Sequence, residues 1–326
     1  MASAAETSSK TSAFPIGRET PRSLAVAAAV LVAFLIAAPY VLYPVFLMKA
    51  LCFALFACAF NLLLGYVGLL SFGHALYFGW AGYVAAYAAK SWGLSPELAI
   101  LTGTATAAGL GIIAGVVAIR RQGIYFAMIT LALAQMMYLV ALRVKFTGGE
   151  DGIQAVPRGR LFGLVDLNNE MNMYVFVLIV VLAALFLIYR IIDSPFGEVL
   201  RAIRENELRT ISLGYNTDRY KLTAFILSAT LAGLAGATKA LVFQLASLTD
   251  VHWTMSGEVV LMTLVGGLGT VFGPIVGAFL IVAMENYLAP FGQWVLVIQG
   301  AIFVVCVLVF RRGIVGELAH RLKVRL

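Results

Sequence analysis

Long apolar runs separated by short polar stretches dominate the chain. The windows 24–38, 173–188 and 295–310 contain no acidic or basic residue. At 1.5 Å per helical residue, runs of this length approach the thickness of a bilayer. The weak ten-residue alternation that is typical of a membrane β-barrel is not found. The pattern predicts an all-α fold, a polytopic transmembrane helical bundle.

The apolar runs predict about ten spans. They cover residues 24–44, 49–66, 69–89, 97–119, 123–142, 173–192, 219–243, 258–268, 270–288 and 292–310. The eighth is shorter than a bilayer crossing and is followed by a glycine-rich turn, so we expect a broken hairpin there. The expected domains are a flexible cytoplasmic tail (1–23), a transmembrane domain (24–316) and a basic cytoplasmic tail (317–326). A cleavable signal peptide is the alternative for the N-terminal segment.

The positive charges predict the orientation. With the N-terminus inside, 16 of the 23 Lys and Arg residues fall on the cytoplasmic side, six fall outside and Lys239 lies within a span. Cytoplasmic loops carry such an excess of basic residues. We therefore expect both termini in the cytoplasm. Contact with anionic membrane lipid accounts for the net charge of +7, so the charge does not indicate nucleic-acid binding.

Composition excludes several function classes. Hydrophobic residues make up 62% of the chain and charged residues 12%, too few to cover a water-soluble globule. The three cysteines lie in apolar runs, and the three histidines are far apart in sequence. No zinc-protease or phosphate-binding loop motif is present. We therefore predict no catalytic residue, no metal and no cofactor, and any ATP hydrolysis must come from another chain.

The stretch 194–217 is the most charged segment between two apolar runs. Ser194 is suited to cap a helix, Pro195 fits its first turn, and Gly214 suits a left-handed stop. The apolar residues recur at helical spacing on one face: Phe196, Val199, Leu200, Ile203 and Ile211. Each charge at mid-bilayer costs roughly 2.5 kcal/mol or more, which predicts a short amphipathic helix on the cytoplasmic surface. Such a helix can lie on lipid headgroups or dock into a partner, and its mixed charge favours docking.

Several motifs carry a family resemblance. The segment SPFGEVLRAIRENELRTISLGYNT (194–217) resembles the cytoplasmic region of branched-chain amino acid ABC importer permeases of the LivM type. Agreement extends to GYVGLLSFGHALYFGWAGYVAAY, RRQGIYFAMITLALAQ, FTGGEDGI, GGLGTVFGPIVGA and the closing RRGIVG, so it covers about residues 60–316. The resemblance implies a coupling helix that seats on an ATPase subunit. Its contact residues would be Glu198, Arg201, Ala202, Arg204, Glu205, Asn206 and Gly214.

The resemblance also implies the partners. They are a second homologous permease subunit, two cytoplasmic ATP-binding subunits and a periplasmic substrate-binding protein. The loop 143–172 is the longest outside segment. It suits contact with the binding protein and equally suits a plain connector.

Two glycine clusters interrupt the apolar runs. The first comprises Gly65, Gly68, Gly73, Gly79 and Gly82, and the second Gly266, Gly267, Gly269, Gly273 and Gly277. Such density indicates either tight helix packing or broken helices that line a translocation pathway. The candidate pathway residues are Ser71, Phe72, Gly73, His74, Phe78, Gly266, Gly267 and Gly269. For His74 alone, a packing role is favoured.

Three charged residues lie in or near the later spans. For Glu258 and Glu285, solvation at a helix end is favoured over proton relay. For Lys239, snorkelling to the outer interface is favoured over a pathway charge.

The leading functional hypothesis is half of the translocation pathway of a binding-protein-dependent ABC importer. Branched-chain or other hydrophobic amino acids are the expected substrates, and urea, short amides or aromatic carboxylates are the alternatives. An ion-coupled secondary transporter would place a carboxylate in mid-span, and the first seven spans have none at their centres. An intramembrane enzyme would need paired ionisable residues, which the pattern does not show.

Overall fold

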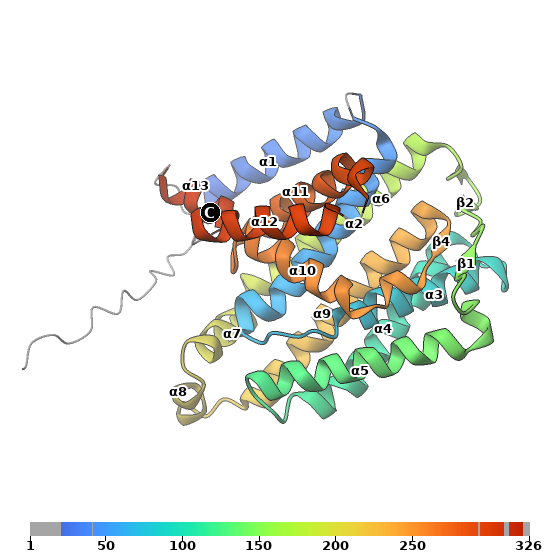
Figure 1. The fold of residues 1–326 in the computed structure, drawn as a ribbon. Helices are drawn as coiled ribbons and strands as arrows, with labels where there is room; N and C mark the ends of the chain where they lie inside the picture. The colour runs from blue at the N-terminus through green and yellow to red at the C-terminus, as the bar shows by residue number, and fades with distance from the viewer. Residues whose placement is uncertain (1–20, 41, 293, 310–312, 322–326) are drawn as a thin grey trace, which may run out of the picture.

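The computed structural model describes residues 21–40, 42–292, 294–309 and 313–321, and it is a helical bundle (Figure 1). Its long helices are α1 (Pro21–Ala37), α2 (Pro44–Asn61), α3 (His74–Lys90), α4 (Pro96–Ala118), α5 (Ile124–Arg143), α6 (Glu170–Ile192), α9 (Thr217–Phe243), α10 (Trp253–Gly266), α11 (Gly273–Leu288) and α12 (Trp294–Val309). Short helices are α7 (Pro195–Glu205), α8 (Glu207–Ser212) and α13 (Gly313–Arg321). The predicted helical fold class is confirmed.

Single turns and short strands complete the chain. The turns are η1 (Ala38–Tyr40), the π-helical η2 (Leu62–Val67), η3 (Lys145–Thr147), η4 (Leu248–Asp250) and η5 (Ala289–Phe291). The strands are β1 (Ile153–Gln154), β2 (Arg160–Leu161), β3 (Val165–Asp166) and β4 (Leu245–Ala246).

Five helices in the described part of the chain are long and apolar enough to cross a membrane. They are Pro44–Val67, Pro96–Ala118, Ile124–Arg143, Glu170–Ile192 and Thr217–Phe243. Shorter apolar helices lie at Ala29–Tyr40, Gly273–Leu288 and Val297–Cys306. A helix occupies each of the ten expected places, but α10 begins at Trp253 and not at 258. The expected hairpin break is confirmed, because α10 and α11 are separated by a turn at 267–272.

The expected tails lie mostly outside the described residues. Residues 1–20 and 322–326 are not described, and α1 begins at Pro21. At the other end α13 continues to Arg321, past the expected domain boundary at 316.

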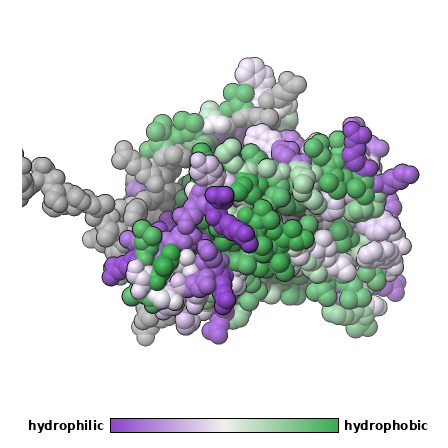
Figure 2. Space-filling model, turned by 90° about the horizontal axis from the view of Figure 1, so that it is seen from below, coloured by the Kyte–Doolittle hydropathy of each residue, from purple (hydrophilic) through white to green (hydrophobic). Residues whose placement is uncertain are grey.

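Helix α2 forms the centre of the bundle. In the most apolar stretch of this span, 94% of the residues are buried. In α4, α5 and α6 the corresponding share is about a third. It packs against α6, α9, α10 and α11. The outer faces of α4, α5 and α6 expose large apolar side chains, as lipid-facing helices do. Seen from below, a hydrophobic surface lies between hydrophilic groups that gather towards the two ends (Figure 2).

Small residues bring α3, α4 and α9 close together. A Cβ at Gly236 would collide with the backbone of Phe78, and one at Gly82 would lie 3.3 Å from the Gly236 carbonyl oxygen. Gly79 packs in the same way on the backbone at Val251. Close backbone approach is the usual reason for small residues at membrane helix interfaces. The packing interpretation therefore holds for Gly79 and Gly82.

The loop 143–172 is tied to the end of α9. Strand β1 pairs antiparallel with β4, with Ile153 opposite Ala246, and β2 pairs with β3. Arg158 donates a hydrogen bond of 2.7 Å to the carbonyl of Val242. Because α8 precedes α9 and β4 follows it, the strands and the charged short helices lie at opposite ends of α9 (Figure 1).

Candidate functional site

The segment α7–α8 begins and ends as its sequence predicts. The Ser194 side chain accepts a hydrogen bond from the Gly197 amide at 3.4 Å, and Pro195 occupies the first turn. Gly214 has φ of +89°, a left-handed conformation that glycine adopts without strain. The predicted cap and stop are confirmed.

The single helix expected here is wrong, because the segment breaks at Asn206. This residue is extended, with φ −158° and ψ 98°, and its side chain accepts a hydrogen bond from the Arg209 amide at 3.0 Å. Asparagine is a strong N-cap, so it ends α7 and starts α8.

The break divides the apolar residues of the segment into two groups. Leu200 and Ile203 on α7 are buried against the bundle, whereas Ile211 on α8 is exposed. Ile211 belongs to a second set of exposed apolar side chains: Leu208, Ile211, Leu213 and Tyr215. We call these four residues the α8 apolar patch. From the predicted contact set, Arg201 and Ala202 are half-buried and the others are exposed: Glu198, Arg204, Glu205, Asn206 and Gly214.

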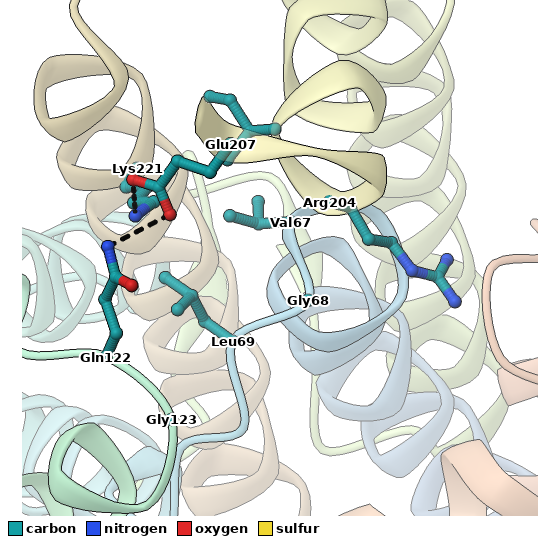
Figure 3. A pocket seen from close by; sticks show the side chains of 9 residues that line it. Val67, Gly68, Leu69, Gln122, Gly123, Arg204, Glu207 and Lys221 are labelled. Carbon is teal, nitrogen blue, oxygen red and sulfur yellow. Dashed lines mark hydrogen bonds and ion pairs between the residues drawn. The ribbon is translucent and has the colours of Figure 1, made fainter. Parts of the chain in front are cut away.

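Two arginines of the predicted contact set reach towards the bundle. The Arg201 guanidinium lies over the Tyr66 ring, 5.6 Å from its centroid, and pairs with Glu198 at 3.5 Å. Arg204 donates a hydrogen bond to the Gly65 carbonyl. In Figure 3 the Arg204 side chain points away from Glu207, towards the end of α2. These arginines therefore anchor α7 to the turn that ends α2.

Glu207 anchors α8 on the other side. Its carboxylate forms an ion pair with Lys221 of α9, whose side chain is only 3% exposed. Gln122 and Thr217 each donate to the same carboxylate at 3.1 Å. A cavity of about 280 Å³ lies beside this network (Figure 3). Its lining comprises Val67, Gly68, Leu69, Gln122, Gly123, Ile203, Arg204, Glu207 and Lys221.

The two glycine clusters meet beside α7. The buried Asn61 side chain donates to the Thr270 carbonyl at 2.9 Å and accepts from the Gly269 amide at 3.1 Å. A Cβ at Gly65 would lie 2.8 Å from the Gly269 amide nitrogen and would collide with Asn61. Gly267 and Gly269 have φ of +127° and +75°, and Gly266 packs on the backbone at Gly273. The sequence pattern does not single out Asn61, since it is one polar residue in an apolar run.

The remaining pathway candidates are enclosed in the core. Ser71, Gly73, His74 and Phe78 are buried and Phe72 is half-buried. His74 Nε2 lies 2.8 Å from the Ser228 hydroxyl, and its ring packs edge-on against Phe60 and Tyr77. The structure thus favours packing for His74, while a pathway role for the set stays a prediction.

Two lysines in or near the spans are paired with carboxylates. Lys239 forms an ion pair with Asp250 and lies near the rings of Phe53, Phe78 and Phe243. Its side chain is 14% exposed, so the expectation that it snorkels is wrong. Lys49 pairs with Glu285 at 3.0 Å. Within the described ranges, no three His, Cys, Asp or Glu residues gather in a way that could hold a metal ion.

The fold and its apolar helices define a multi-pass helical membrane protein. The family described as "Branched-chain amino acid transport system / permease component" matches residues 41–307, and the chain belongs to this family. The resemblance expected from the motifs is confirmed.

Named relatives agree with the family. Over 288 residues the chain is 27% identical to the high-affinity branched-chain amino acid transport system permease protein LivM of Escherichia coli K12, covering 81% of this chain and 68% of that protein. The LivM protein of Salmonella typhimurium is 26% identical over the same coverage. A probable LivH permease of Methanocaldococcus jannaschii is 28% identical over 176 residues, 50% of this chain and 53% of that protein. No solved structure gives a significant match.

Proposed function

We propose that this chain is one permease subunit of a binding-protein-dependent ABC importer in a bacterial inner membrane. It pairs with a second homologous permease, two cytoplasmic ATP-binding subunits and a periplasmic binding protein. All ten apolar helices then serve the membrane domain, with both termini in the cytoplasm. Family membership supports the assignment, and so does the exposed, charged α7–α8 segment at the end of α9 opposite the strands.

The docking surface for the ATPase is the exposed side of α7–α8. It combines the α8 apolar patch with four exposed residues of the contact set whose side chains are not bonded to the described part of the bundle, namely Glu198, Glu205, Asn206 and Gly214. Leu208, at 78% exposure, has the largest exposed fraction in the patch. Apolar side chains rimmed by charge are typical of a protein interface, because burying them in a partner removes them from water.

Replacement of one patch residue tests the docking surface. Leu208→Asp places a charge where the partner's apolar groove would close, so we expect at least a tenfold loss of ATPase subunit co-purified in mild detergent. Leu164→Asp is the matched control, because Leu164 is an exposed leucine in the outer loop before β3. Equal recovery of ATPase with Leu208→Asp and Leu164→Asp would refute this docking surface.

The energy source separates this proposal from an ion-coupled transporter. Uptake should continue when the proton gradient is collapsed with ATP maintained, because the energy comes from the ATPase. Abolished uptake under those conditions would favour the secondary transporter.

The substrates are branched-chain or other hydrophobic amino acids, as the names of the relatives indicate. Thermal-shift screening of the co-purified binding protein tests this assignment. The alternative substrates are urea, short amides and aromatic carboxylates. If one of these stabilises the binding protein, and leucine, isoleucine and valine do not, the substrate assignment is wrong but the importer assignment still stands.

A further inference from the structure

The turn that ends α2 has an unusual geometry. Residues Leu62–Val67 form a π-helical turn, and the amides of Gly68 and Leu69 both donate to the Leu63 carbonyl, at 3.1 and 3.2 Å. Insertions of this type occur often at functional sites. The turn presents the Gly65 carbonyl to the Arg204 guanidinium, so α7 is bonded to the main chain of α2.

The same turn is bonded to the break between α10 and α11. Asn61 is 3% exposed and satisfies one amide and one carbonyl of the 267–272 turn. Loss of either bond would leave a half-buried main-chain group without its partner. A Cβ placed at Gly269 would lie 3.1 Å from Arg204 Nη1 and 3.3 Å from the Gly65 carbonyl oxygen. The two glycine-rich turns therefore meet at main-chain contact, and α7 reaches them through the Arg204 side chain.

We call Asn61, Gly65, Arg204, Gly269 and Thr270 the glycine joint, and we propose that it transmits movement between α7 and the two glycine-rich turns. The inference rests on the proposed function, since it needs an ATPase that moves α7. Arg204 carries a displacement of α7 to the Gly65 carbonyl, and Asn61 carries it on to the 267–272 turn. The main chains of the two turns are packed against each other, so a displacement that Arg204 passes to the Gly65 carbonyl also moves the 267–272 turn.

The joint assigns a different task to Arg204 from that of the docking surface. Its guanidinium is hydrogen-bonded to the Gly65 carbonyl of the same subunit and not to the ATPase, so Arg204 is a positioning residue. Asn61 is a positioning residue for the same reason. The proposal therefore predicts that damage to the joint separates transport from ATP hydrolysis, while damage to the α8 apolar patch removes the ATPase itself.

A methyl group at Gly65 tests the joint in the complete complex. Gly65→Ala would press Asn61 and Gly269 apart. In proteoliposomes we expect uptake per ATP hydrolysed to fall at least tenfold, with co-purified ATPase and its hydrolysis within twofold of wild type. Gly109→Ala is the matched control, because Gly109 lies in α4 with no other side chain or backbone within 4 Å of an added Cβ. It should leave uptake per ATP unchanged.

Unchanged uptake per ATP in Gly65→Ala would overturn the joint and leave the importer assignment standing. If Gly65→Ala does not enter the membrane, Arg204→Met decides, since it keeps the stem and removes only the guanidinium. It should lower uptake per ATP at least threefold, with partial recovery in Arg204→Lys. An unchanged ratio, or loss of co-purified ATPase in Arg204→Met, would also overturn the joint. Failure of the wild-type chain to retain any ATPase would instead contradict the proposed function.

Discussion

Each end of α9 holds a lysine that pairs with a carboxylate, and the two environments differ. Lys221 and Lys239 are eighteen residues apart, which is five helical turns, so they lie on the same face about 27 Å apart. Lys221 pairs with Glu207 inside a polar network that borders the cavity (Figure 3). Lys239 pairs with Asp250 among three phenylalanine rings.

The burial of a lysine and its access to water are therefore separate quantities. A cavity of about 280 Å³ has room for several waters, and two further hydrogen-bond donors surround Glu207. Aromatic rings attract an ammonium group but cannot replace its counter-charge. Removing the carboxylate should therefore destabilise the protein more for the Lys239–Asp250 pair than for the Lys221–Glu207 pair.

Removal of the Asp250 carboxylate should have the largest effect on the free energy of unfolding. Asp250→Ala leaves the Lys239 ammonium buried without a counter-charge, so we expect the free energy of unfolding to fall by roughly 3–5 kcal/mol. The measurement is a denaturant titration of the purified chain in mixed micelles. The double variant Asp250→Ala with Lys239→Met removes both charges and should recover most of the loss. No recovery would show that the buried charge is not the cause.

Removal of the Glu207 carboxylate should lower the free energy of unfolding by a smaller amount. Glu207→Ala leaves Lys221 next to the cavity, where water and the Gln122 carbonyl can solvate it, so we expect a loss of roughly 1–3 kcal/mol in the same titration. A loss equal to that of Asp250→Ala would mean that the cavity does not solvate the lysine, and the contrast between the two ends would disappear.

The exposed ion pair on α7 should have the smallest effect on the free energy of unfolding. Glu198 is 58% exposed and lies 3.5 Å from Arg201. Exposed pairs contribute about 0–1 kcal/mol, and Arg201 keeps its place over the Tyr66 ring without Glu198. Glu198→Ala should therefore change the free energy of unfolding by less than about 0.5 kcal/mol. A larger change would show that the charge, and not the ring, holds Arg201.

Local features of the fold can be predicted from the sequence. Ser194, Pro195 and Gly214 act through the backbone next to them, so their positions suffice to predict where the charged segment begins and ends. The apolar runs predict where the helices lie, because a membrane helix must satisfy its own main chain. The break at Asn206 is also local, but a capping asparagine inside an amphipathic stretch is easily taken for a surface residue of one helix.

The contacts between distant segments cannot be predicted in this way. Arg204 meets Gly65 across 139 residues, and Asn61 meets Thr270 across 209. A sequence pattern shows that Lys239 is a charge within a span, but not that Asp250 turns back to meet it. The α8 apolar patch escapes prediction for a related reason, since the helical phase counted from α7 does not continue past Asn206.

The central position of α2 has a consequence for biosynthesis. Lys49 lies near the start of α2, and its counter-charge Glu285 is encoded 236 residues later. At about 5–20 residues per second, the ribosome needs roughly 12–47 seconds to make that stretch. During that interval the nascent chain lacks Glu285 and most of α11, so the Lys49 ammonium group must be sheltered by lipid headgroups or by the insertion machinery.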